Sequence, residues 1–155
     1  MRANVMSRLT RLPLSDVLRT AATVAVAAFV EVGLRTVSLP RLAAMVGAPL
    51  LLEDPGGSGP AVDPEFVLPP GARRQLAATR RVLRHWPFGD TCLRQALISG
   101  QRLRRFQPHL QVGVAKFEGE VRAHAWLVIR GRILDPMGAA ASYLPLNSIP
   151  SGLDR

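Results

Sequence analysis

The hydrophobic pattern of the chain is most regular after Cys92, where it has the period of a helix. Apolar residues recur three or four positions apart and form one face, while most of the arginines fall outside it. The members of this apolar face are Leu93, Ala96, Leu97, Gly100, Leu103 and Phe106. Asp90 or Thr91 can serve as the N-cap, because either side chain can accept a hydrogen bond from a free amide of the first turn. The pattern predicts a helix that begins at the only cysteine of the chain.

Downstream of this helix the pattern alternates, as it does in β-strands. Strands are predicted over Leu110–Phe117, Arg122–Arg130 and Gly131–Pro136, with Tyr143–Leu146 as one more short strand. The turn Arg130-Gly131-Arg132 joins the second and third of these into a hairpin. In the second strand, the period of two places four side chains on one face: Arg122, His124, Trp126 and Val128. We expect three antiparallel strands to pack on the cysteine helix.

The first half of the chain is predicted to be mainly helical. Helices are expected over Ser15–Val37, which is long and mostly apolar, over the short segment Arg41–Val46, and over Gly71–Trp86. In the last helix Leu76, Leu83 and Trp86 face inward, and five arginines face mostly outward: Arg73, Arg74, Arg80, Arg81 and Arg84. Glu53–Pro60 is the clearest loop. The predicted organisation is an N-terminal helical region with a Gly/Pro-rich loop over residues 1–70, followed by a catalytic domain over residues 71–155.

Three residues of the second half can form a nucleophilic centre. Cys92 lies where unpaired amides and the positive end of the helix dipole favour a thiolate over a thiol. Asp135, near the end of its strand, can approach His124 from the neighbouring strand of the hairpin. Cys92, His124 and Asp135 would then be nucleophile, base and orienting carboxylate. A lone cysteine in a helix is more often a buried apolar residue than a nucleophile. The presence of His124 and Asp135 makes the catalytic interpretation the favoured one.

Three aromatic residues lie close to these positions in the sequence. Trp126 shares a strand face with His124, and Trp86 and Phe88 precede the cysteine helix. They are candidates for the walls of a substrate-binding site, although hydrophobic packing explains Trp86 and Phe88 equally well. The backbone amide of Cys92 is the expected oxyanion donor.

The order of these residues, with the cysteine on a helix and the histidine and aspartate on strands, resembles the transglutaminase and papain-like enzymes. Three motifs narrow the resemblance. They are Cys-Leu-x-x-Ala-Leu at the start of an Arg-rich helix, Gln111-Val112-Gly113-Val114, and Ala123-His124-Ala125-Trp126 before a short strand that ends in Asp. With these motifs the C-terminal half of the chain resembles the leader peptidases of lasso-peptide biosynthesis, the B2 proteins. The resemblance implies an α+β, papain/transglutaminase-like core that removes the leader peptide of a ribosomally made precursor with Cys92, His124 and Asp135.

The same resemblance implies a set of partners. The leader peptide of the precursor is the substrate, and a separate ATP-dependent lasso cyclase takes the released core. In the resembled family the leader is held by a small winged-helix-like recognition domain, the B1 protein, which is either fused to the peptidase or encoded apart. The region before Gly71 shows no strand–helix alternation of the kind such a domain needs. We therefore expect the recognition protein to be a separate chain.

Composition limits the alternatives. The chain has 155 residues, of which 48% are hydrophobic, and a formal net charge of +9 that is carried almost entirely by arginine. Such a charge favours acidic peptides, nucleic acid or anionic lipid as partners. Two alternatives to a peptidase therefore stay open: a transglutaminase-like acyltransferase and a non-enzymatic basic nucleic-acid-binding module. The sequence has neither the closely spaced ligands of a zinc site nor a Walker or dinucleotide motif, so we expect no metal and no cofactor.

Two segments bear on the location of the protein. Met1–Leu12 is Arg-rich, like the start of a signal peptide, but no convincing cleavage site follows it. The apolar run Thr20–Val30 has eleven residues, fewer than the roughly twenty that a helix needs to cross a bilayer. We expect a cytoplasmic protein, with an interfacial membrane role for the N-terminal helix as the less favoured alternative.

Overall fold

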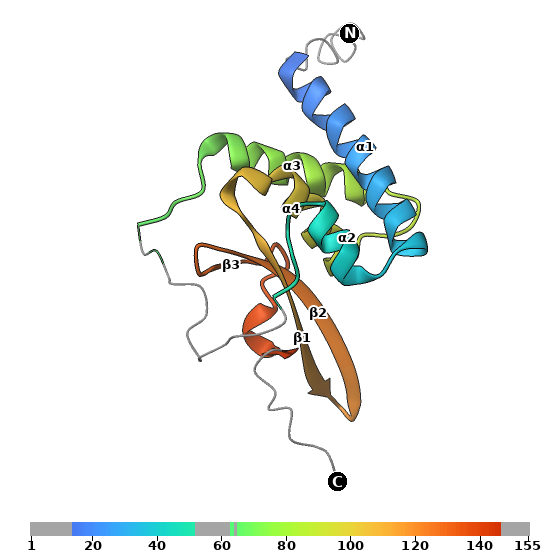
Figure 1. Ribbon diagram of the computed structural model, residues 1–155, viewed down its shortest axis with the longest axis vertical. Coiled ribbons are helices and arrows are strands. Elements are labelled where there is room, and N and C mark those ends of the chain that lie inside the picture. Colours follow the sequence, from blue (N-terminus) through green and yellow to red (C-terminus); the bar gives the residue numbers. More distant parts are fainter. Residues whose placement is uncertain (1–13, 52–62, 64, 147–155) are drawn as a thin grey trace, which may run out of the picture.

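The structure is a computed structural model that describes residues 14–51, 63 and 65–146. Figure 1 shows a group of helices at one end of the molecule and a long β-hairpin that extends away from them. Two sequence predictions lie outside the described residues: the Arg-rich start Met1–Leu12 and the loop Glu53–Pro60.

Four α-helices lie close to their predicted positions. They are α1 (Leu14–Thr36), α2 (Leu39–Met45), α3 (Pro70–Arg84) and α4 (Cys92–Arg102). The N-cap of α4 is Thr91, whose hydroxyl accepts a hydrogen bond from the amide of Arg94 at 3.4 Å. The predicted apolar face of this helix extends past its end, because Leu103 and Phe106 belong to a separate 3-10 turn, Arg104–Phe106, and its cap. All five arginines predicted to face outward on α3 are exposed.

Over the described residues the sheet has four antiparallel strands, which correspond to the three strands predicted to pack on α4 and to the predicted short strand Tyr143–Leu146. They are β1 (His109–Phe117), β2 (Glu120–Ile129), β3 (Arg132–Leu134) and β4 (Leu144–Pro145), in the order β3-β2-β1-β4. Both tight hairpins have two-residue turns with positive φ at each position: Glu118-Gly119 between β1 and β2, and Arg130-Gly131 between β2 and β3. This is the type I′ geometry that matches the twist of the strands and that glycine favours. Between β3 and β4 a 3-10 turn spans Ala140–Ser142.

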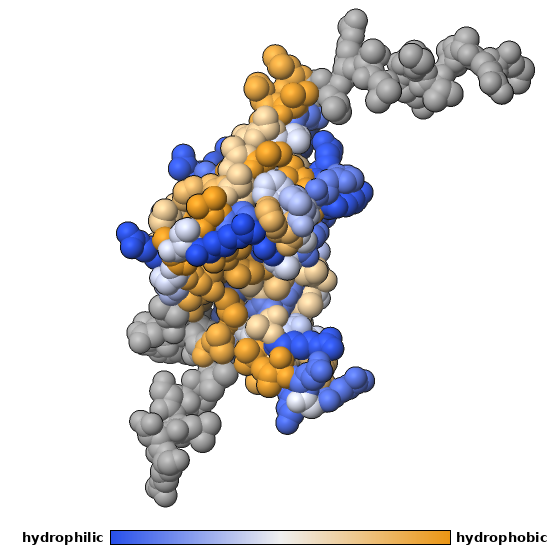
Figure 2. All heavy atoms as spheres, turned by 90° about the vertical axis from the view of Figure 1, so that its right-hand side faces the viewer, coloured by the Kyte–Doolittle hydropathy of each residue, from blue (hydrophilic) through white to orange (hydrophobic). Residues whose placement is uncertain are grey.

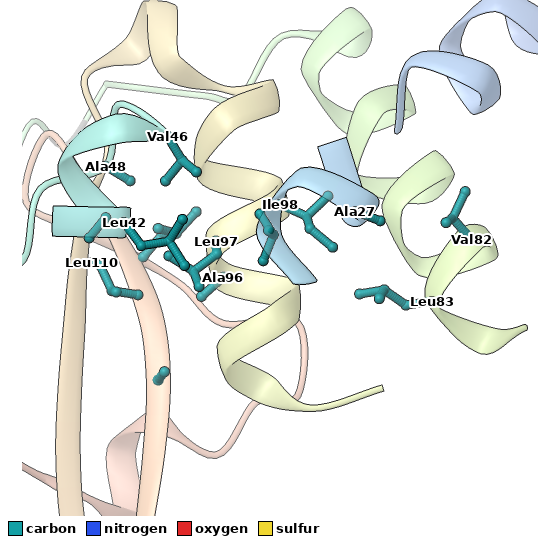
Figure 3. Packing of buried hydrophobic residues seen from close by; sticks show 14 residues of the cluster. Ala27, Leu42, Val46, Ala48, Val82, Leu83, Ala96, Leu97, Ile98 and Leu110 are labelled. Atoms are coloured by element: carbon teal, nitrogen blue, oxygen red, sulfur yellow. The ribbon is translucent and has the colours of Figure 1, made fainter. Parts of the chain in front are cut away.

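One hydrophobic core joins the helices to the sheet. Figure 3 shows Leu97 of α4 beside Leu42 of α2 and Leu110 of β1, with Ala27 of α1 and Leu83 of α3 beyond Ile98 of α4. Ala125 and Leu127 of β2 belong to the same buried cluster. Helices from before and after residue 70 therefore share a core, and the division of the chain at residue 70 stays a prediction.

The other face of the sheet has a smaller core of its own. Trp126 and Val128 of β2 pack there with Ala140, and the half-buried Tyr143 packs against them. In Figure 1 the 3-10 turn that carries Ala140 lies beside β1 and β2, away from the helices. The alternation along β2 thus separates two environments: odd-numbered residues face the helices, and even-numbered residues face this turn.

Helix α1 has the 23 residues expected for the predicted helix Ser15–Val37, shifted by one position. By length and composition alone this helix is enough to cross a membrane, whereas the sequence argument about membranes had considered only the apolar run Thr20–Val30. Core helices of soluble proteins satisfy the same criterion, and Ala27 and Val30 of α1 are indeed buried in the core. Leu14, Leu18 and Val32 are more than half exposed. Figure 2 shows a hydrophobic surface at the end of the molecule where α1 projects.

Candidate active site

A buried histidine–aspartate pair connects β2 to the end of β3. His124 Nε2 lies 3.0 Å from Asp135 Oδ2, and the two side chains are only 5% and 4% exposed. The hairpin produces this contact, because the pairing of Leu127 with Leu134 brings the residue after β3 alongside the first half of β2. The structure therefore brings together two of the three residues that the sequence nominated for catalysis.

Asp135 is held as an acceptor by its own loop. Its Oδ2 accepts hydrogen bonds from the amides of Ala139 (2.6 Å) and Ala140 (2.7 Å), and its Oδ1 accepts one from Met137 (3.0 Å). Burial raises the pKa of Asp135, but the hydrogen bonds from His124 and from the amides of Met137 and Ala140 outweigh it, and the net pKa is lowered. Asp135 is therefore ionised near neutral pH, with three backbone amides and one imidazole directed at it.

The state of Asp135 assigns the tautomer of His124. An ionised carboxylate can only accept hydrogen bonds, so the proton of their shared contact belongs to His124 Nε2. In the neutral imidazole the other nitrogen, Nδ1, is then the acceptor. That nitrogen is the one available to take a proton from a nucleophile.

Two aromatic rings flank the imidazole. The ring of Trp126 is stacked with it at 5.8 Å between centroids, and the ring of Tyr143 lies 5.0 Å away. Trp126 is itself fully buried, at 1% exposure. The predicted sharing of a strand face by His124 and Trp126 is thus present in the structure, and the two rings restrict rotation of the imidazole.

Cys92 is the first residue of α4 and is half-buried against the core. Helix α4 packs on β2 through the cluster that contains Ala125 and Leu127, whereas His124 projects from the other face of the strand. In the part of the chain that the structure describes, no hydrogen bond joins the Cys92 thiol to His124. Catalytic contacts are often long before substrate binds. The catalytic role of Cys92 therefore stays a prediction, because the contact between His124 and Asp135 does not involve the cysteine.

The start of α4 is fixed by two polar contacts. Arg94 donates to buried Glu31 of α1 through Nε (2.9 Å) and Nη2 (3.3 Å), and the amide group of Gln95 donates to Asp90 at 2.8 Å. The hydrogen bond from Arg94 lowers the pKa of Glu31 more than burial raises it, and the charges of Arg94 and Arg35 act in the same direction. These contacts attach the first turn of α4, and with it Cys92, to α1 and to the preceding loop.

The aromatic residues before α4 form one small group. Trp86 is half-buried against the same core as Cys92, and its ring meets that of Phe88 edge-on at 6.2 Å. Phe88 is 45% exposed, and the guanidinium of Arg35 lies 4.5 Å from its centroid. Trp126, in contrast, lies on the other face of β2. The three aromatic candidates therefore do not line a single wall, and a substrate-binding role for any of them stays a prediction.

Sequence reasoning missed two parts of this site. Tyr143 was considered only as a strand residue, and its contact with His124 depends on a return of the chain that no local pattern specifies. The three backbone amides that contact Asp135 had a signal in the sequence, because the segment Asp135-Pro136-Met137-Gly138 favours a turn in which the carboxylate accepts hydrogen bonds from nearby amides. Among the described residues there is no group of three His, Cys, Asp or Glu side chains that could hold a metal ion.

Comparison with known families identifies the superfamily of the chain. A model of the transglutaminase-like superfamily matches residues 28–148, from the second half of α1 to just beyond β4. The match covers well over half of the 155 residues, and the chain belongs to this superfamily, whose members are typically cysteine hydrolases or transferases. No curated protein and no solved structure matches the chain.

Proposed function

We propose that this protein is a cysteine peptidase that removes the leader peptide from a ribosomally made lasso-peptide precursor. The observation that carries the proposal is the buried His124–Asp135 pair at 3.0 Å, in a chain whose only cysteine begins a helix packed on the same strand. Membership of the transglutaminase-like superfamily supports cysteine acyl chemistry. The choice of a lasso precursor rests on the motifs around Cys92 and His124.

In the proposed reaction the thiol proton of Cys92 passes to His124 Nδ1, and the sulfur attacks the carbonyl carbon of the scissile peptide bond. The imidazolium then gives that proton to the leaving amine, and the C–N bond breaks. A thioester now joins the leader to Cys92. Water, deprotonated by His124, attacks the thioester and releases the leader as a carboxylic acid, and the thiol is restored. Asp135 holds the proton on Nε2 throughout and stabilises the imidazolium by its charge.

The thiol must come within reach of Nδ1 for this sequence to operate. Helix α4 packs on the face of β2 that carries Ala125, whereas His124 lies on the opposite face. The Cys92 thiol at the start of α4 therefore has to reach the imidazole past the edge of β2. The backbone amide of Cys92, which lies in the first turn of α4 where amides have no intrahelical acceptor, is proposed to bind the developing oxyanion.

Two alternatives differ from this proposal in their products. An acyltransferase would use the same three residues but pass the thioester to an amine instead of to water. A basic nucleic-acid-binding module would need none of them and is favoured only by the net charge of +9. The superfamily membership supports the first of these alternatives more than the second.

The test is cleavage of a purified precursor in water enriched in oxygen-18, followed by mass spectrometry. We expect the released leader to gain one heavy oxygen at its new carboxyl end, and Cys92→Ala to abolish release while its circular dichroism spectrum is unchanged. Cys92→Ser should be nearly inactive, because a serine hydroxyl does not supply a thiolate. Cleavage that persists undiminished in Cys92→Ala would end the proposal. A product joined to an added amine, with no heavy oxygen, would favour the acyltransferase.

A further inference from the structure

A cavity lined by arginines lies between α1 and α3, apart from the candidate active site. It has a volume of about 130 Å³ and is lined by Asp16, Arg19 and Thr20 of α1 and by Arg74, Ala77, Ala78 and Arg81 of α3. Three of these seven residues are cations. The only carboxylate, Asp16, already accepts a hydrogen bond from Arg19 at 2.7 Å. The lining therefore has more positive charge than it can neutralise.

A fourth arginine, Arg102, lies outside the cavity lining but near Arg19. Arg102, at the end of α4, is half-buried, and its Nε is fully buried without a hydrogen-bond partner among the described residues. Burial lowers the pKa of Arg102, and the positive charge of nearby Arg19 lowers it further. Within the described chain, Arg74, Arg81 and Arg102 form no salt bridge. Burial of an unpaired cationic group such as the Arg102 guanidinium is costly, whereas Arg74 and Arg81 are exposed.

We propose that the cavity between α1 and α3 binds a single oxyanionic group, a phosphate or a carboxylate, between Arg19, Arg74 and Arg81. Guanidinium groups present several donors in a plane and bind the oxygens of such groups in pairs. The volume equals the share of about four water molecules in the liquid, at roughly 30 Å³ each, which suits one small oxyanion. Ala77 and Ala78 add apolar surface to the lining of the same cavity.

This site is separate from the cysteine. The cavity is lined by residues of α1 and α3, and no residue of α4, Cys92 included, belongs to its lining. The bound group would therefore act on affinity or stability and would not react. The proposal does not depend on the peptidase function, since binding can be measured without any cleavage.

The test is a calorimetric titration of the full 155-residue chain with inorganic phosphate at constant ionic strength. We expect saturable binding with one phosphate per chain. The double variant Arg74→Gln/Arg81→Gln should weaken it at least tenfold, because two charge-assisted contacts are lost. The matched control is Arg73→Gln/Arg80→Gln, which removes the same charge from exposed positions of α3 outside the cavity and should change the affinity less than twofold. Since all four side chains are exposed, both variants should fold.

A second arm identifies the source of the oxyanion. A short peptide whose only charged group is one glutamate is titrated into the protein, and its binding is compared with that of the same peptide carrying glutamine. Binding of phosphate alone would assign the cavity to phosphoryl groups, and binding of the glutamate peptide alone would assign it to carboxylates; either result supports the proposal. No saturable binding of either probe would overturn it. Equal weakening by the two double variants would also overturn it, because it would show a diffuse effect of net charge.

Discussion

At the scale of single residues, Asp135 is proposed to position His124, and this role can be separated from proton transfer. Asp135→Asn keeps a side chain of the same shape but removes the charge and allows the imidazole to adopt the other tautomer. We expect precursor cleavage to slow by roughly four orders of magnitude, with little change in KM, as measured by single-turnover mass spectrometry.

The control for Asp135 is Glu120→Gln, which removes a carboxylate from the exposed start of β2 and should leave the rate unchanged. A rate equal to wild type in Asp135→Asn would show that another carboxylate orients the histidine. Asp90 would then be the next candidate, although its side chain accepts a hydrogen bond from Gln95 at 2.8 Å.

The period of two along β2 was sufficient to predict which side chains accompany His124. It placed Trp126 on the same strand face, and the structure stacks the two rings. The predicted hairpin also placed Asp135 beside His124, and the two side chains are in contact in the structure. The position of Cys92 relative to that face could not be predicted in the same way. It depends on how α4 crosses the sheet, and that crossing is determined by tertiary packing of residues such as Leu97 and Leu127 and not by any local period.

At the scale of secondary-structure elements, each α-helix and β-strand that the structure describes was predicted, but the long segments had stronger local signals than the short ones. The helices carry strong local signals, among them Thr91 before α4 and Pro70 at the start of α3. The strand β4 has only two residues, too few to show alternation, and it depends on Gly113 of β1. A Cβ at position 113 would lie 2.8 Å from the carbonyl oxygen of Leu144 and 2.6 Å from the Trp126 ring. The missing side chain is what allows the fourth strand to approach.

Two arginines of α4 provide a matched comparison of paired and unpaired cations. Arg94→Met breaks a buried ion pair and should lower the free energy of unfolding by about 3 kcal/mol, the low end for such pairs, because Arg35 still contacts Glu31 at 2.9 Å. Arg102→Met replaces a half-buried cation that has no salt bridge among the described residues. It should leave the free energy of unfolding within about 1 kcal/mol of wild type or raise it. Urea denaturation at pH 7 measures both.

The effect of Arg94 should also depend on pH in a defined direction. Glu31 has a lowered pKa in the folded chain, so its contribution to stability is complete above its ordinary value of 4.5 and is lost as the pH falls through the folded pKa. The difference between wild type and Arg94→Met should therefore be constant above about pH 5.5 and shrink below 4.5. A difference that stayed the same down to pH 3 would show that Arg94 acts through packing of its aliphatic stem.

At the scale of the whole molecule, α1 combines two roles that the sequence alone could not separate. Its inner face contributes Ala27 and Val30 to the shared core, while Leu18 and Val32 are 61% exposed. A helix that is apolar on both faces usually contacts something on both. The superfamily match begins at residue 28, so the first half of α1 lies outside the matched region. The exposed side of α1 is thus the proposed docking surface for the separate leader-recognition protein.

This arrangement predicts that the peptidase depends on its partner. Cleavage of the precursor should be slow with the chain alone and rise sharply when the recognition protein is added. Leu18→Gln/Val32→Gln should reduce that stimulation and leave the unstimulated rate unchanged, because both side chains are exposed and distant in sequence from Cys92. Val121→Gln, at a position of β2 that is 73% exposed, is the control and should leave the stimulation intact. The initial rate of leader release at increasing concentrations of the recognition protein measures each variant.

Full-speed processing by the isolated chain, unaffected by addition of the recognition protein, would show that the chain binds the leader unaided. Loss of stimulation in Val121→Gln but not in Leu18→Gln/Val32→Gln would move the docking surface from α1 to the hairpin.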